Sequence, residues 1–228
     1  MRHESDSLGT VSVPATAYYG VHTQRAVENF PITGELVNPE LIRGLIEIKE
    51  AAALVNAAAG DLPIETADAI VAATKQLLQQ PIDYTMFPLD PIQGGAGTSM
   101  NMNVNEVVAN LALELLGDEK GNYARINPND HVNRGQSTND VYPSAGKLAM
   151  IRLMAPLFDE LEALISTLGA KADEFARVYK MGRTQLQDAV PMTLGNSFHA
   201  YLKPLRRDLR RLQDAEAALH TLNLGGSA

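Results

Sequence analysis

The sequence contains no cysteine, which excludes disulfides, thiolate nucleophiles and cysteine-ligated metal sites. It has no apolar run close to the roughly 20 residues that a membrane-spanning helix needs, and residues 1–6 lack the apolar core of a signal peptide. Basic residues are also few: 19 Lys and Arg against 27 Asp and Glu give a net charge of -8. Because nucleic-acid phosphates need a basic surface, we expect no binding to nucleic acid. The lack of a membrane-spanning run and of a signal core leads us to expect a cytoplasmic protein that does not bind membranes.

What the chain does contain favours helices. Its 228 residues suffice for one large domain or two modest domains with a real core, and 45% of them are hydrophobic while only 5% are aromatic. The abundance of Ala and Leu is typical of α-helical proteins. We therefore expect a mainly α fold.

Capping residues and helix breakers place the helices along the chain. Asn38-Pro39-Glu40 supplies the cap, the first-turn proline and the first-turn acid of a helix start, and Gly60 ends that helix. Residues 1–35 are expected to be irregular, apart from a possible short strand at 10–13. The expected helices are 39–59, 63–80, 107–116, 141–179 and 193–222.

Three stretches share one pattern, in which small residues and neutral hydrogen-bonding side chains stand directly before a helix. They are centred on Thr98, Ser137 and Thr184. Such residues commonly cap helices, but a helix start also attracts anions through its free N–H groups and positive partial charge. Capping alone explains each stretch taken singly, whereas their repetition favours a shared pocket for a small carboxylate. The glycines before Thr98 do not form a nucleotide P-loop, because no Lys follows the last of them.

The long helix limits how such a pocket can be built. From Pro143 to Tyr179 it has about 37 residues and would span roughly 55 Å. One subunit therefore cannot easily bring Ser137 and Thr184 to a single small ligand, whereas antiparallel neighbours in a homo-oligomer can. We expect sites that are assembled from several subunits.

Four sequence blocks, in order along nearly the whole chain, carry a specific resemblance. They are Val13-Pro14 with Ala17 to Thr23, Arg25-Ala26 and Glu28 to Phe30; Gly94 to Glu106; Asn127 to Asp140; and Met181 to Gly195. On these blocks the chain resembles the fumarase/aspartase superfamily and, within it, the aspartate ammonia-lyases. The resemblance implies a small mixed, mostly helical N-terminal domain at residues 1–139. The first two long antiparallel helices of a central helical bundle would follow at 140–228, in a homotetramer.

The resemblance also implies roles for particular residues in binding L-aspartate. Thr98, Ser137 and Thr138 would hold the β-carboxylate, Thr184 would contact the α-carboxylate, and Asn139 and Gln185 would lie near the amino group. The family reaction is the reversible anti elimination of ammonia to give fumarate. Gln185 favours this reaction over that of fumarases, since a leaving hydroxide benefits from a proton donor and Gln cannot supply a proton at neutral pH. A class II fumarase and a non-catalytic helical assembly module derived from the fold are the alternatives.

The superfamily's signature loop, Gly-Ser-Ser-x-Met-Pro-x-Lys-x-Asn-Pro, is absent from the 228 residues. In relatives this loop supplies the catalytic Ser base. We therefore expect an N-terminal fragment without a catalytic base and without lyase activity of its own. No metal cluster is visible and no cofactor is expected, although the resemblance allows activation by Mg²⁺. His131 is either a general base, an anion contact or, as is commoner for a lone His in a polar loop, a hydrogen-bonded structural residue.

Overall fold

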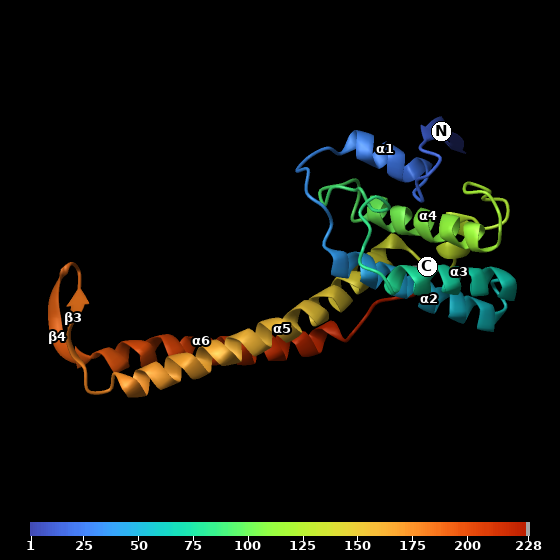
Figure 1. The fold of residues 1–228 in the computed structure, drawn as a ribbon. Helices are drawn as coiled ribbons and strands as arrows, with labels where there is room; N and C mark the ends of the chain where they lie inside the picture. Colours follow the sequence, from blue (N-terminus) through green and yellow to red (C-terminus); the bar gives the residue numbers. More distant parts are fainter. Residues whose placement is uncertain (227–228) are drawn as a thin grey trace. The chain divides into compact units, whose positions relative to one another are not determined.

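The structure is a computed structural model that describes residues 1–226, and the chain in it divides into two compact units. Unit 1 comprises Met1–Ala149 together with the chain end from Leu222, and unit 2 comprises Met150–Thr221. The fold is mainly helical, as the sequence predicts (Figure 1). Helix α5 (Thr138–Glu174) begins in unit 1 and continues into unit 2. The domain boundary between residues 139 and 140 stays a prediction.

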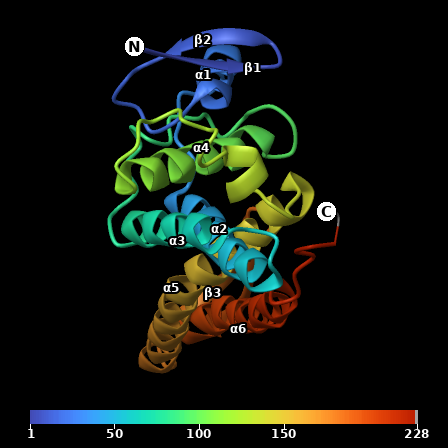
Figure 2. The same cartoon turned by 90° about the vertical axis from the view of Figure 1, so that its right-hand side faces the viewer.

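Unit 1 is layered around one buried helix. Its elements are β1 (Arg2–Asp6), β2 (Gly9–Val13), α1 (Val21–Asn29), α2 (Pro39–Ala59), α3 (Ile64–Leu78), α4 (Thr98–Leu115), the π-helix η1 (Pro128–Val132) and the first turns of α5. Strands β1 and β2 form an antiparallel hairpin. Helix α4 lies between α1 with this hairpin on one side and α2 with α3 on the other (Figure 2). Most side chains of α4 between Met100 and Leu113 are buried, so this helix forms the centre of the core.

The helices with clear capping signals are confirmed. The Asn38 side chain accepts a hydrogen bond from the Glu40 backbone N–H, and Gly60 ends α2 in the left-handed conformation at φ 82°. Helix α3 follows Pro63, and α6 (Leu194–Leu219) lies within its predicted range. These boundaries depend on residues within one turn of the helix end, which is why the sequence alone predicts them.

The expectation that residues 1–35 are irregular is wrong. The strand expected at 10–13 is present as β2, but β1 and α1 are present as well. The start of α1 is capped from far along the chain: the buried Glu106 carboxylate accepts hydrogen bonds from the backbone N–H groups of Gly20, His22 and Thr23. At Gly20 a Cβ would lie 2.5 Å from a Glu4 carboxylate oxygen, so only glycine fits there. Because the cap is 83 to 86 residues away in sequence, no local pattern predicts this helix.

The expected helix start at Val107 is also wrong. Helix α4 begins at Thr98, so Asn101, Asn103 and Asn105 lie inside the helix and are buried. Asn is a poor helix former because its side chain competes for backbone hydrogen bonds. Here partners on other elements take part of that hydrogen-bonding capacity: Asn101 bonds Lys49 and Thr138, and Asn103 donates to the Met86 carbonyl. Tertiary contacts therefore override the local preference.

Asp90 ties two loops of unit 1 together. Its carboxylate accepts hydrogen bonds from the Thr33 backbone N–H and hydroxyl and from the N–H groups of Gly34 and Ile92. Burial by itself would raise the pKa of Asp90, but these hydrogen bonds lower it to about 2. Because the folded-state pKa is depressed, the stabilisation is fully present above the ordinary pKa of 3.8 and is lost as the pH falls toward 2.

We therefore predict that Asp90→Asn lowers the urea midpoint at neutral pH and reduces the further loss of stability between pH 4 and pH 2. Urea unfolding at these pH values measures both effects. Asp188→Asn is the matched control, since Asp188 is an exposed carboxylate paired with Arg183 and exposed pairs contribute little. An acid dependence in Asp90→Asn as steep as in the wild type would contradict this role.

Unit 2 consists of two helical segments and a hairpin. Strands β3 (Tyr179–Thr184) and β4 (Gln187–Thr193) form the hairpin, and α5 and α6 run side by side (Figure 1). The rings of Phe175 and Phe198 pack with centroids 5.5 Å apart. Gly195 lets the helices approach, since a Cβ there would lie 2.4 Å from the Ala172 carbonyl oxygen. The expectation that the stretch centred on Thr184 stands directly before a helix is wrong. The stretch forms a hairpin, whose turn lacks the usual Asn-Gly signal.

Candidate functional site

Ser137 caps helix α5. Its Oγ accepts a hydrogen bond from the Asn139 backbone N–H at 3.2 Å, and Asp140 Oδ1 accepts one from the Ser137 backbone N–H at 3.2 Å. This reciprocal pair is a capping box, in which each side chain satisfies a backbone donor near the helix start. The capping role predicted for this stretch is therefore present. The N–H groups of Asp140 and Val141 both donate to the Ser137 carbonyl, so the start of α5 attracts an anion through its positive partial charge and the Thr138 N–H.

Thr138 is tied to helix α4 rather than to its own helix. Its Oγ1 accepts a hydrogen bond from Asn101 Nδ2 at 3.1 Å. The two helix starts also meet at Gly97, which precedes Thr98: Gly97 has a φ of 90°, and a Cβ there would lie 2.4 Å from the ring of Tyr142. A side chain at position 97 would thus separate the helices. The structure therefore brings the predicted stretches around Thr98 and Ser137 together.

Between these helix starts lies an open hollow of about 550 Å³. Its lining includes Gly95, Gly97, Asn139 and Tyr142, so two of the three predicted stretches contribute to it. Thr98 is exposed, and Ser137 and Thr138 are half-buried; these three side chains flank the hollow's helix starts without lining it. No carboxylate is among the side chains that line the hollow, so its lining does not repel an anionic ligand.

The loop that leads into α5 is held by a buried cation. Lys49, on α2, is fully buried, and its ammonium donates to Asn101 Oδ1 at 2.7 Å, Asn133 Oδ1 at 2.9 Å and Gln136 Oε1 at 2.9 Å. Burial lowers the pKa of Lys49 to about 7, while attraction to the buried Asp140 opposes that shift. The sequence analysis missed Lys49, although a Lys between the apolar positions of α2 is a signal that could have found it.

Thr184 and Gln185 lie in unit 2, on the β3–β4 hairpin. Thr184 ends β3, and Gln185 with Leu186 forms the two-residue turn; all three are exposed. Gln185 and Leu186 have φ values of 46° and 66°, a conformation that residues other than glycine rarely adopt. A two-residue hairpin turn of type I′ requires positive φ at both central residues, and Asn or Gly usually supplies it. Two of the six predicted site residues thus belong to unit 2, and the other four belong to unit 1.

His131 has the structural role that the sequence analysis favoured. It lies in η1, and its Nδ1 accepts a hydrogen bond from the Asn127 backbone N–H at 3.0 Å. The Asn127 side chain in turn accepts from the backbone N–H groups of Asn129 and Asp130. His131 therefore stabilises the turn that leads to Gln136.

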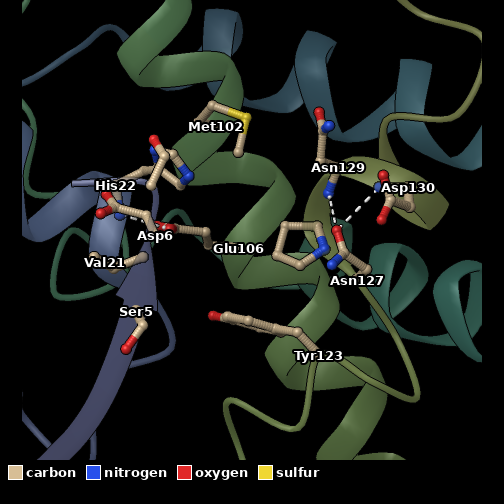
Figure 3. Close-up of a pocket in the computed structure, with 12 residues that line it drawn as sticks. Ser5, Asp6, Val21, His22, Met102, Glu106, Tyr123, Asn127, Asn129 and Asp130 are labelled. Atoms are coloured by element: carbon tan, nitrogen blue, oxygen red, sulfur yellow. Dashed lines mark hydrogen bonds between the residues drawn. The ribbon is translucent and has the colours of Figure 1, made fainter. Parts of the chain in front are cut away.

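A second cavity, of about 300 Å³, lies between η1 and the elements β1 and α1 (Figure 3). Asp6, His22 and Glu106 line one side of it, and Asn129 and Asp130 line the other. None of the predicted site residues is among its lining residues. The carboxyl groups of Asp6, Glu106 and Asp130 in this lining would repel a dicarboxylate ligand. We therefore take the hollow between the helix starts as the candidate site.

Within residues 1–226, no group of three or more His, Cys, Asp or Glu side chains is arranged to hold a metal ion. Likewise, no helix in the described part of the chain is both long and apolar enough to cross a membrane.

Comparisons with known proteins identify the family of the chain. The family described as Lyase matches residues 9–228. Aspartate ammonia-lyase of a Bacillus species is 49% identical over 228 residues, and that of Escherichia coli K12 is 48% identical over 230; each match covers 100% of this chain and 48% of the relative. The chain therefore spans about half the length of these curated relatives.

Solved structures match the fold equally well. The fumarate lyase:delta crystallin structure from Brucella melitensis superposes with a TM-score of 0.93 at 48% identity, covering 99% of this chain and 51% of that one. The class II fumarase from Schistosoma mansoni has a TM-score of 0.90 at 37% identity, covering 100% of this chain and 48% of that one.

Proposed function

Since this chain belongs to the lyase family that matches residues 9–228, we propose that it forms part of an ammonia-lyase that eliminates ammonia reversibly from L-aspartate to give fumarate. Relatives that carry the name aspartate ammonia-lyase, at 48% and 49% identity over the whole chain, support this substrate. The observation that carries the proposal is the meeting of two helix starts, α4 and α5, around a hollow without carboxylates.

Neutral donors at helix starts suit the charge that develops in this reaction. Removal of a proton from the β-carbon places a second negative charge on the β-carboxylate, as an aci-carboxylate. Hydroxyl groups of Thr98, Ser137 and Thr138, backed by the first-turn N–H groups of α4 and α5, would stabilise that charge more than they stabilise the substrate. The side chains thereby lower the barrier without carrying a charge themselves.

The leaving group distinguishes the proposed reaction from that of a fumarase. An ammonium group leaves as neutral ammonia and needs no added proton, whereas hydroxide benefits from an acid. Gln185 cannot donate a proton at neutral pH, which favours L-aspartate over L-malate. The class II fumarase from Schistosoma mansoni, at 37% identity, is the relative that keeps the second candidate open.

We propose that each site takes residues from several subunits of a homo-oligomer, most simply a tetramer. Helix α5 has 37 residues, which corresponds to a length of roughly 55 Å, and it separates Ser137 from Thr184 along the chain. Apolar side chains of unit 2 remain about half exposed, among them Leu153, Leu157 and Leu164. Pairing with helices of neighbouring subunits would bury them. The neighbour would then supply Thr184 and Gln185.

The proposed reaction also needs a base to take the β-proton. The 228 residues contain no Ser-Ser signature loop, so the base is assigned to a sequence outside them. The elimination requires no cofactor, since its electrons stay within the substrate; activation by Mg²⁺ and a cytoplasmic location stay predictions.

Two parallel assays test the proposal. The intact protein that carries this chain should form fumarate and ammonia from L-aspartate and should leave L-malate essentially unchanged. Residues 1–228 alone should show no ammonia-dependent consumption of fumarate. Turnover of L-malate by the intact protein would favour the fumarase, and turnover of neither substrate would favour the non-catalytic assembly module.

The strained hairpin turn gives a separate prediction. Leu186→Gly should raise the free energy of unfolding by about 1 kcal/mol, because glycine adopts a positive φ without strain. The same change should lower kcat/KM for L-aspartate by about tenfold or more, because it loosens the position of the neighbouring Gln185. Urea unfolding and initial rates measure the two effects in the intact protein.

Leu8→Gly is the matched control, since Leu8 is also an exposed leucine in a turn between two strands, 79% exposed. It should leave kcat/KM unchanged. If Leu186→Gly gains stability and keeps full activity, the strain has no role in the reaction.

A further inference from the structure

The contacts of Lys49 fix which way three amide side chains face. An ammonium group can only donate hydrogen bonds, so each amide that meets it must present its oxygen. Lys49 meets Asn101, Asn133 and Gln136 in this way, at 2.7 to 2.9 Å. Only the protonated amine has three N–H donors for these three acceptors. Burial lowers the pKa of Lys49 to about 7, and attraction to the buried Asp140 opposes that shift.

The orientation of Asn101 is therefore set by Lys49. With Oδ1 turned to the ammonium, Asn101 Nδ2 faces away from it and donates to Asn133 Oδ1 at 3.1 Å and to Thr138 Oγ1 at 3.1 Å. Both N–H groups of this amide are thus used. Without the cation, the amide could turn over and present an oxygen to Thr138 instead.

The orientation of the Asn101 amide determines whether the Thr138 hydroxyl donates or accepts. Among the described residues, Thr138 Oγ1 takes part in one hydrogen bond, as the acceptor from Asn101. A hydroxyl has a single hydrogen to donate. Because Asn101 cannot accept it, that hydrogen remains for a ligand at the start of α5.

We propose that Lys49 is a positioning residue that acts through Asn101 to keep the Thr138 hydroxyl as a hydrogen-bond donor to the substrate carboxylate. This inference rests on the proposed function, in which Thr138 contacts that carboxylate. Lys49 itself does not touch the ligand, because it is fully buried. Its contribution is to settle the direction of the hydrogen bonds before the substrate binds, so that no reorientation is needed as charge develops.

A reversal of the hydrogen bond between positions 101 and 138 tests the proposal. In Asn101→Asp, a carboxylate keeps an acceptor for Lys49 but turns a second acceptor toward Thr138, which then donates inward. We expect kcat in the intact protein to fall on the order of 100-fold, as for the loss of one transition-state donor, with a smaller change in KM. Lys49→Met, which frees the amide to turn over, should lower kcat in the same direction.

A double-mutant cycle separates this effect from simple structural damage. In a Thr138→Val background there is no hydroxyl left to reverse, so Asn101→Asp should then cost little further activity. Asn110→Asp is the matched control: Asn110 is another buried Asn of α4, and it bonds Tyr18 and Tyr123 instead. It should show no coupling to Thr138→Val. If the costs of Asn101→Asp and Thr138→Val simply add, the proposal is overturned.

Neutron diffraction from deuterium-exchanged crystals of the intact protein gives a readout that does not depend on activity. The proposal requires deuterium on Asn101 Nδ2 toward Thr138, with the Thr138 deuterium pointing away from Asn101. A Thr138 deuterium directed at Asn101 overturns the positioning role, whatever the enzyme's activity. Failure of the wild-type protein to use L-aspartate would instead overturn the proposed function, so the two failures are distinguishable.

Discussion

Thr138→Ala in the intact protein is expected to lower the turnover of L-aspartate on the order of 100-fold or more. The substitution removes a hydroxyl at the start of α5 that Asn101 holds in place from the neighbouring helix. In the proposed reaction this hydroxyl donates to the aci-carboxylate, whose extra charge exists only near the transition state. The loss should therefore appear mainly in kcat and less in KM, both measured from initial rates of fumarate formation.

Thr167→Ala is the matched control for that result. Thr167 lies in the same helix, and its hydroxyl donates to the Ala163 carbonyl, a common and exposed helix contact. Its removal should leave turnover unchanged. Near-normal turnover in Thr138→Ala would show that the Thr138 hydroxyl does not stabilise the transition state.

The second large effect is a recovery of activity from two inactive variants. Ser137→Ala and Thr184→Ala should each be nearly inactive in the intact protein, although Ser137→Ala also loses a helix cap that typically contributes about 1 kcal/mol. If Ser137 and Thr184 of one site come from different subunits, subunits dissociated and reassembled as a one-to-one mixture should regain activity. Random pairing of two contributing subunits predicts that roughly a quarter of the sites are restored.

Each variant dissociated and reassembled alone is the control, and neither should regain activity. The measurement is the rate of fumarate formation per mole of subunit. No recovery in the mixture, with mixed oligomers demonstrated by mass, would mean that one subunit supplies both residues, and the shared-site proposal would fail.

Local signals account for the parts of the fold that the sequence predicts. Asn38 and Gly60 specify the two ends of α2 because both act within one turn of the helix. The parts that were wrong depend on distant partners. Helix α1 is capped by Glu106, and the early turns of α4 are stabilised by contacts of Asn101 with Lys49 and Thr138. No local pattern contains that information.

In the candidate site, too, some features follow from local sequence signals and others depend on distant partners. A capping box at Ser137 and Asp140 follows from sequence spacing, and the structure contains it. The contact between Asn101 and Thr138 follows only from the packing of α4 against the start of α5. The ligand contacts of Thr98, Thr184 and Gln185 are implied only by resemblance to a family. The pattern of small and neutral residues indicates a carboxylate pocket, but not which side chain contacts which group.

A crystal structure of the intact protein with bound fumarate tests the central claim most directly. If the proposed function is right, one carboxylate of fumarate lies within hydrogen-bonding distance of Thr98, Ser137 and Thr138, at the starts of α4 and α5. The proposal also predicts Thr184 and Gln185 of another subunit near the rest of the ligand. Fumarate bound in the cavity beside Glu106, or away from both helix starts, would contradict it.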